Sequence, residues 1–221
     1  MTMTKLVIFG TGDIARLAHF YFERDSRFDV VGFTVDPAFH TASSFNGLPL
    51  VSFDAVHSVF PPSDFMMFVA ISYAQMNQLR ADRYTQAKSK GYTLASYVST
   101  RATVLADEPV GDNCFILEDN TIQPFVRIGS NVTLWSGNHI GHDSSIGDHC
   151  FVASHVVVSG HVTIGPYCFL GVNATLRNGI TVGARTLIGA GALVMKDTPD
   201  GSVFIAARTP ADSRTSDLMG L

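Results

Sequence analysis

The chain has 221 residues, of which 46% are hydrophobic, and its formal net charge at pH 7 is −4. This length holds one large or two small domains, and without a basic surplus nucleic acid and anionic membranes are poor candidates for partners. The longest apolar run, at 65–71, is too short to cross a bilayer, and the first ten residues lack the pattern of a secretion signal. We therefore expect a cytoplasmic protein without a membrane partner.

Residues 1–97 alternate between strand-like and helix-like patterns. Apolar runs predict strands at 5–9, 28–35, 48–51, 65–71 and 92–97, and helical segments are predicted at 13–23, 54–59 and 74–90. Strands that alternate with helices favour a parallel sheet covered on both faces. We therefore predict a Rossmann-like α/β domain over residues 1–97.

The turn after the first predicted strand has the pattern of a nucleotide-binding loop. Residues 10–15, GTGDIA, fit G-x-G-x-x-G/A, in which glycines permit a tight turn and let phosphate approach a helix N-terminus. Asp36 ends the second predicted strand, where a carboxylate can hold a ribose hydroxyl. A nicotinamide-dependent dehydrogenase is one interpretation, although the segment lacks a second mononucleotide-binding half. In the other interpretation, Gly10 and Gly12 serve only the turn.

From Val104 to Val194 the sequence repeats with a period of six. Every sixth residue is aliphatic, 16 times in succession, and half of these residues are followed directly by glycine. This period is typical of a parallel β-helix, in which each hexapeptide forms a short strand and a turn and three hexapeptides form one coil of a triangular prism. We expect each aliphatic residue to point inward and the glycine after it to adopt a positive φ at the turn.

The position two residues before each aliphatic residue is also expected to face the interior, and it holds mostly small residues. All three cysteines, Cys114, Cys150 and Cys168, fall at this position. We expect them to be core thiols without a redox or metal role. The period breaks after Val194, residues 204–207 could add one more strand, and a polar tail follows, so we assign residues 98–221 to the second domain.

Five of the eight histidines lie between positions 139 and 161. His149, His155 and His161 are six residues apart, so within one chain they fall on successive faces of the prism and cannot converge on a metal ion. We therefore expect no metal site.

The length of one coil, 18 residues, places Gly160 next to His142 and His161 beside Asp143. A histidine that faces outward beside a position without a side chain has the space and the backbone N–H groups that a general base needs. The alternative is that His142 is an ordinary surface histidine.

The glycine loop, the hexapeptide repeat and the segment NHIGHDSSIG at 138–147 together resemble bacterial sugar acyltransferases of the sialic acid O-acetyltransferase and nucleotide-amino-sugar N-acetyltransferase type. The resemblance implies a left-handed β-helix, a homotrimer, and acetyl-CoA in the groove between neighbouring prisms. It also implies that His142 is the general base and that Asp143 orients it.

The resemblance implies the remaining site residues as well. The backbone at Gly160, Gly189 and Ala190 would hold the thioester and the pantetheine arm of acetyl-CoA. The acceptor would contact the residues Gly10, Thr11, Gly12, Asp36, Trp135 and Asn138, the first four of them through its nucleotide. Asp13 departs from the family pattern, because its negative charge at a helix N-terminus is unfavourable to a pyrophosphate.

The sequence therefore predicts an acetyl-CoA-dependent N-acetyltransferase that acts on a nucleotide-linked amino sugar of the 4-amino-4,6-dideoxy type in polysaccharide biosynthesis. O-acetylation of a sugar such as sialic acid is the nearest alternative. From another class, the chain could be a non-catalytic nucleotide-binding or scaffold protein.

Overall fold

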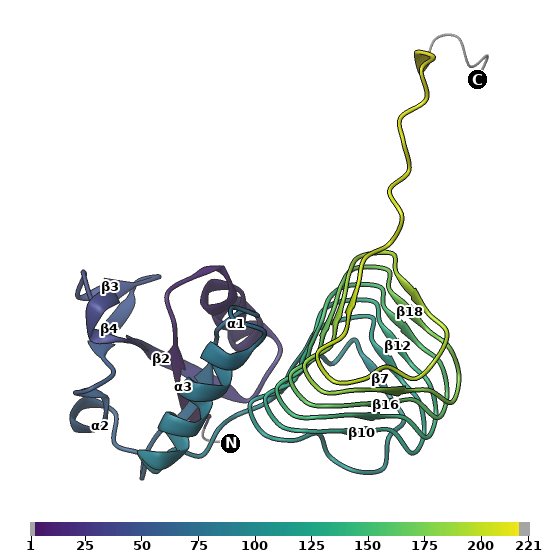
Figure 1. Ribbon diagram of the computed structural model, residues 1–221. Coiled ribbons are helices and arrows are strands. Elements are labelled where there is room, and N and C mark those ends of the chain that lie inside the picture. The colour runs from purple at the N-terminus through teal and green to yellow at the C-terminus, as the bar shows by residue number, and fades with distance from the viewer. Residues whose placement is uncertain (1–2, 217–221) are drawn as a thin grey trace.

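The computed structural model describes residues 3–216, which form an α/β domain followed by a three-sided prism (Figure 1). The sheet of the α/β domain has five strands in the order β3-β4-β2-β1-β5. These strands are β1 (Thr4–Phe9), β2 (Phe28–Val35), β3 (Ser44–Phe45), β4 (Leu48–Ser52) and β5 (Met66–Val69). All neighbours pair in parallel except β3 and β4.

The helices of this domain cover both faces of the sheet. They are α1 (Asp13–Arg24), α2 (Val56–Val59) and α3 (Gln78–Ser89), with a 3-10 turn at Pro37–Phe39. Successive side chains of a strand point to opposite faces, so Leu6 and Ile8 of β1 pack with α1, whereas Val7 and Phe9 lie in the core that contains α2 and α3. The predicted parallel sheet with two covered faces is confirmed.

Two local features of the domain differ from the sequence prediction. The short hairpin β3–β4 was not expected, although it turns at Asn46 and Gly47 with φ values of 48° and 80°, the Asn-Gly signal of a two-residue hairpin. Helix α3 begins at Gln78 instead of position 74, because the three residues before it have left-handed φ values of 53°, 52° and 68°. That conformation is incompatible with a continuous right-handed helix.

The prism has three sheets of two-residue strands. The domain-side sheet contains β6 (Tyr97–Val98), β8 (Phe115–Ile116), β11 (Thr133–Leu134), β14 (Phe151–Val152), β17 (Phe169–Leu170), β20 (Leu187–Ile188) and β22 (Val203–Phe204). The distal sheet contains β7 (Thr103–Val104), β9 (Thr121–Ile122), β12 (His139–Ile140), β15 (Val157–Val158), β18 (Thr175–Leu176) and β21 (Leu193–Val194). The lower sheet contains β10 (Arg127–Ile128), β13 (Ser145–Ile146), β16 (Thr163–Ile164) and β19 (Thr181–Val182).

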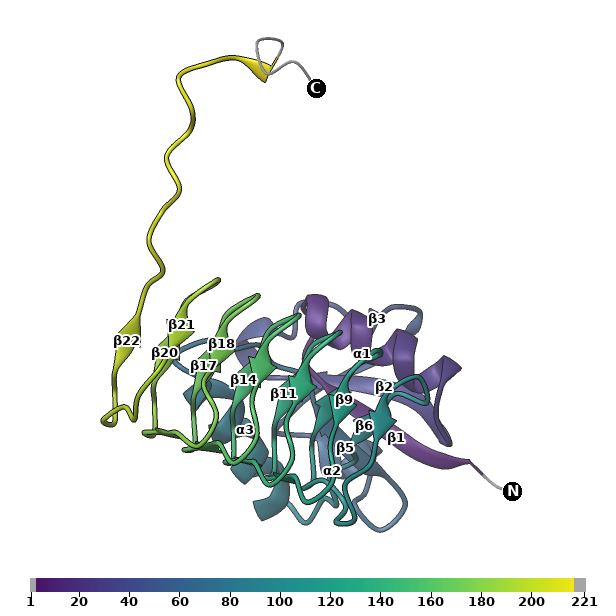
Figure 2. The same ribbon diagram turned by 90° about the vertical axis from the view of Figure 1, so that its right-hand side faces the viewer.

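The period of six sets the register of these sheets. Leu134 pairs with Val152, one coil of 18 residues further on, and the other strands follow the same rule. The coils wind in the left-handed sense (Figures 1 and 2). The inward aliphatic residues are buried along most of the prism, whereas Val104 on the first distal strand is 39% exposed because no further coil covers it. Cys114, Cys150 and Cys168 are buried free thiols, as predicted.

The glycine after the aliphatic residue has a different role from the one predicted. Positive φ occurs two residues later, at residues such as Asn131, Asp143 and His155. A Cβ added at Gly141 would lie 2.5 Å from the backbone nitrogen of Gly160 in the next coil. These glycines are therefore required because neighbouring coils approach each other closely at the corners.

Buried polar side chains join the two domains. Asn113 of the prism accepts a hydrogen bond of 2.7 Å from the N–H of Val69 and donates one of 3.2 Å to its carbonyl. Arg80 of α3 is only 2% exposed, and its guanidinium donates to the carbonyls of Ser72, Asn131, His149 and Cys150. Burial lowers the pKa of Arg80 to about 10, so this side chain stays charged at neutral pH.

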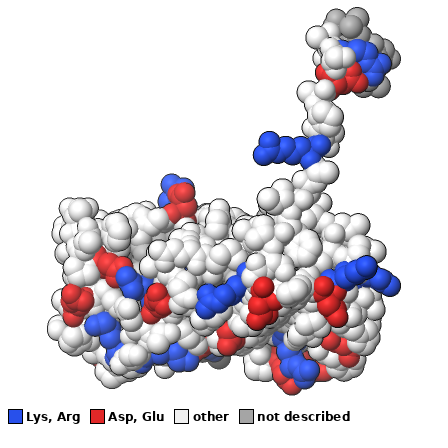
Figure 3. Space-filling model, viewed as in Figure 1, with Lys and Arg blue, Asp and Glu red and all other residues white. Residues whose placement is uncertain are grey.

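The chain leaves the last coil after β22, and residues 205–216 run away from the prism (Figure 2). Acidic and basic side chains are interspersed on the visible face, without a large area of one sign (Figure 3). Among the helices of residues 3–216, none combines the length and the apolar character that crossing a membrane requires.

Candidate active site

His142 lies at the corner where the chain passes from the distal sheet to the lower sheet. Its backbone N–H donates to Oε1 of Gln123 at 2.8 Å, which fixes the main chain at this point. Its Nδ1 lies 2.8 Å from Oδ2 of Asp143. Both side chains are about half exposed, at 50% and 42%. A carboxylate that accepts from Nδ1–H leaves Nε2 as the free acceptor of the ring.

The hexapeptide backbone explains why two adjacent side chains meet. Asp143 occupies the corner position that has a positive φ in each hexapeptide, here 58°, and Asp tolerates this conformation better than most residues. Its backbone N–H donates to the carbonyl of Pro124 in the preceding coil at 3.2 Å. The repeat therefore holds the carboxylate beside the imidazole.

Gly160 lies against the free edge of the His142 ring, as the coil length predicted. A Cβ at Gly160 would be only 2.7 Å from Nε2 of His142. Any side chain at this position would displace the imidazole. The ring therefore faces bare backbone, which leaves room for a ligand atom next to Nε2.

His161 is a neighbour whose importance the sequence reasoning missed. Its ring lies 4.9 Å from that of His142 in a T-shaped arrangement, and its Nε2 is 3.9 Å from Oδ2 of Asp143. His142, Asp143 and His161 offer possible metal-ligand atoms within 4.8 Å of one another. The spacing of 19 residues, one coil plus one, could have revealed this cluster.

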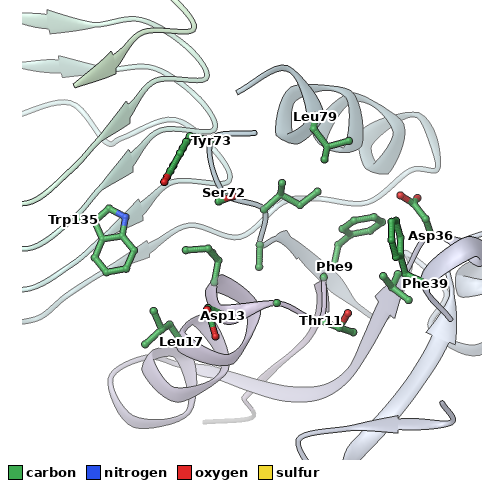
Figure 4. Close-up of a pocket in the computed structure, with 16 residues that line it drawn as sticks. Phe9, Thr11, Asp13, Leu17, Asp36, Phe39, Ser72, Tyr73, Leu79 and Trp135 are labelled. Carbon is green, nitrogen blue, oxygen red and sulfur yellow. The ribbon is translucent and has the colours of Figure 1, made fainter. Parts of the chain in front are cut away.

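A cavity of about 550 Å³ lies between the α/β domain and the prism (Figure 4). It brings together five of the predicted acceptor-binding residues, which are Gly10, Thr11, Gly12, Asp36 and Trp135. Asp13 and the aromatic residues Phe9, Phe39 and Tyr73 complete much of its wall. Asp36 is held in place by Arg83, whose Nε and Nη2 donate to Oδ2 at 3.0 and 2.8 Å.

Asn138, the sixth predicted acceptor-binding residue, does not line this cavity. Its side chain is 1% exposed inside the prism. It donates to the carbonyl of Trp135 and accepts from the N–H of Val156 at 2.8 Å. Asn138 therefore supports the backbone of the corner that carries Trp135.

A smaller hollow of about 370 Å³ shares Tyr73 and Trp135 with the cavity and continues along the prism past Phe151, Phe169 and Ala190. Gly189 lies beside it in the chain, and its N–H donates to the carbonyl of Phe204 at 2.7 Å. This hollow follows the corner between the domain-side and distal sheets. Ala190 is thus near Trp135, at a different corner from Gly160.

One chain therefore presents its candidate site in two parts. His142, Asp143 and Gly160 lie at the corner between the distal and lower sheets, whereas Trp135 and Ala190 lie at the corner between the domain-side and distal sheets. None of the residues that line the cavity belongs to the His142 corner. The distal sheet separates the two parts.

Comparison with known proteins identifies the repeat. Residues 126–160 and 161–196 match the family model "Bacterial transferase hexapeptide (six repeats)". No curated protein sequence matches the chain.

Several solved structures share the whole architecture. The acetyltransferase domain of PglB from Neisseria gonorrhoeae FA1090 is 23% identical, with a TM-score of 0.79 over 90% of this chain and 95% of that one. PerB from Caulobacter crescentus, solved in complex with CoA and GDP-perosamine, is 25% identical, with a TM-score of 0.77 over 90% and 92%. WeeI from Acinetobacter baumannii AYE is 19% identical, with a TM-score of 0.75 over 90% and 96%. The predicted fold and the resemblance to this group are confirmed.

Proposed function

We propose that the protein transfers the acetyl group of acetyl-CoA to the amino group of a nucleotide-linked sugar of the 4-amino-4,6-dideoxy type. The observation that carries this proposal is the pair His142–Asp143, whose free Nε2 faces the bare backbone of Gly160. The match to a transferase repeat family supports it, as does the likeness to PerB, a protein solved with CoA and GDP-perosamine. Such a product would serve the synthesis of a surface polysaccharide or another glycan.

In the proposed reaction the sugar amine attacks the thioester carbonyl carbon. His142 takes a proton from the attacking nitrogen at Nε2, the C–S bond breaks, and the sulfur leaves as the thiol of CoA once it gains a proton. Asp143 keeps the proton on Nδ1 before the reaction and stabilises the imidazolium that forms during it. A positioned base of this kind contributes roughly 10²- to 10⁴-fold in rate.

The two parts of the site imply that neighbouring chains share it. We infer a homotrimer in which the His142 corner of one chain faces the Trp135 corner of the next. Acetyl-CoA would then lie between them, with the thioester near Gly160 and the pantetheine arm along Gly189 and Ala190. Holding two large substrates in one groove supplies the proximity on which such a transfer depends.

The acceptor would enter the cavity of the α/β domain. Gly10, Thr11 and Gly12 would contact it through the backbone, Asp36 through its carboxylate, and Trp135 would shape the end nearest the prism. O-acetylation of a sugar remains the alternative reaction of the same site, because His142 could deprotonate a hydroxyl in the same way.

Release of the CoA thiol with a panel of nucleotide-linked amino sugars tests the proposal. We expect activity with at least one 4-amino sugar and a loss of about 10²- to 10⁴-fold in kcat for His142→Asn. His57→Asn in α2, remote from both parts of the site, is the matched control and should keep full activity. If the wild type and His142→Asn are equally inert while both bind nucleotide, the protein is a non-catalytic binding or scaffold protein.

A further inference from the structure

The walls of the cavity carry an unusual charge for a nucleotide-binding loop. Asp13 and Asp36 line it, and none of its 16 lining residues is basic. The charge of Asp36 is compensated by Arg83, since this pair is close and only 21% exposed on each side. Asp13 therefore dominates the electrostatics at the glycine loop.

Asp13 is only weakly compensated. Its side chain is 85% exposed, and its partner is Arg16 at 3.0 Å, itself 66% exposed. Exposed pairs of this kind contribute little. Arg16 does not line the cavity and faces another hollow, beside His19 and Glu23.

The charge at the start of α1 decides what the loop can hold. A helix N-terminus carries the equivalent of about half a positive charge, which is what draws phosphate to such loops. The full negative charge of Asp13 at the first position of α1 outweighs it. A phosphate at the loop would meet net repulsion, whereas a neutral group would not.

The rest of the cavity suits an uncharged ring. A Cβ at Gly12 would meet no atom within 4 Å, so a ligand can touch the backbone there. Phe39 is 64% exposed beside the loop, and an exposed aromatic face stacks well on a flat or apolar ring face. Both donors of Arg83 use Oδ2 of Asp36, which leaves its Oδ1 to accept from a hydroxyl or a ring N–H.

We propose that the cavity binds an uncharged, hydroxyl-bearing ring of the acceptor, a nucleoside or a sugar, and that the Gly10–Asp13 loop holds no phosphate. A diphosphate attached to this ring would point out of the cavity. The proposal rests on the proposed function for the nature of the acceptor, and its test measures binding alone.

The test is calorimetric titration of the full-length protein with uridine, thymidine and guanosine, with their diphosphates, and with a methyl glycoside of a 4-amino sugar. For the wild type we expect the best nucleoside or the glycoside to bind, and the matching diphosphate to bind no more than about threefold tighter. Asp13→Asn keeps the size of the side chain and removes the charge. It should tighten diphosphate binding about fivefold at low salt, the size of a charge effect at a helix terminus, and leave the uncharged ligands unchanged.

The nucleoside and glycoside titrations identify which ring the cavity takes. Gly12→Ala provides a second variant, because alanine fits its φ of −90° but narrows the cavity. It should weaken binding of the uncharged ring at least tenfold without changing thermal unfolding.

Two results would overturn the proposal. One is a wild-type diphosphate that binds more than tenfold tighter than its nucleoside and is unaffected by Asp13→Asn. The other is failure of every uncharged ligand to bind. A protein that binds the uncharged ring but releases no CoA from acetyl-CoA would contradict only the proposed function.

Discussion

At the scale of the residue, glycines with the same sequence context have different physical roles. Gly147 follows an inward aliphatic residue, and a Cβ there would lie 2.8 Å from the nitrogen of Pro166 in the next coil. Gly12 has open space around it. The sequence predicts that both positions need glycine, but only coordinates reveal whether the space belongs to the protein or to a ligand.

Gly147→Ala should therefore lower the free energy of unfolding by about 1–3 kcal/mol, the usual cost of forcing extra atoms into a packed region. Gly12→Ala should leave it unchanged, because neither its backbone angles nor its surroundings oppose a methyl group. Urea unfolding of the two variants measures the difference. Equal stability of Gly147→Ala and wild type would show that the coils can separate at this corner without cost.

The catalytic pair and its limits are also visible at this scale. The period of six was enough to place Gly160 beside His142, because the inward positions fix the length of a coil. It did not single out the contact of His161 with His142, and it offered no signal that Asn138 would be buried. Those outcomes depend on side-chain direction at a corner, which the position in the repeat alone does not determine.

At the scale of the element, the end of α1 is tied to the start of the prism through Asp25. Its carboxylate accepts from the hydroxyl of Tyr97 at 2.7 Å, from the N–H and hydroxyl of Thr100 at 2.9 and 2.5 Å, and from Ser99 at 3.3 Å. Burial opposes ionisation of Asp25, but these hydrogen bonds outweigh it and hold its pKa below the usual value.

A lowered pKa in the folded state means that Asp25 stabilises the protein above the unfolded pKa of about 4 and that this contribution is lost as the pH falls through the folded pKa. Asp25→Asn should thus be less stable than wild type at pH 7, by about 1 kcal/mol for a partly exposed group. The difference should shrink below pH 4. Urea unfolding from pH 7 to pH 3 measures it, and a constant difference would mean that packing, not charge, links these elements.

Element boundaries show which parts of the fold were predictable. The strands of the prism and the order of strands and helices in the α/β domain follow from apolar periodicity. The start of α3 did not, because three consecutive residues with left-handed φ precede it. Nothing in the composition of residues 75–77 requires that conformation. The domains' packing also depends on buried polar contacts such as Arg80 with prism carbonyls, which no local pattern announces.

At the scale of the whole molecule, the faces of the prism differ in what they present to the outside. On the distal sheet, Val157 is 40% and Leu193 is 62% exposed. The matching outward residues of the lower sheet include Arg127, Thr163 and Thr181, which are polar. Exposed aliphatic residues on a flat sheet favour contact with another chain. The distal sheet is therefore the face through which we expect the chains of the trimer to meet.

Leu193→Asp should shift sedimentation from trimer to monomer, because it would bury an unpaired charge in the interface. Since the site is expected to be shared between chains, acetyl transfer should fall with it. Thr181→Asp on the lower sheet is the matched control and should sediment and react as the wild type does. A stable trimer of Leu193→Asp would place the interface on another face.

The contacts of Arg80 have a consequence for how this chain can be divided. Three of the four carbonyls that satisfy the guanidinium belong to two successive coils of the prism. In a fragment that ends near residue 97, the same cation would stand on the surface of α3 without these acceptors. In the complete fold, α3 can reach its final position only after those coils have formed. The architecture of two domains thus behaves as a single cooperative unit, in which the repeat forms first and the nucleotide-binding half completes its folding on it.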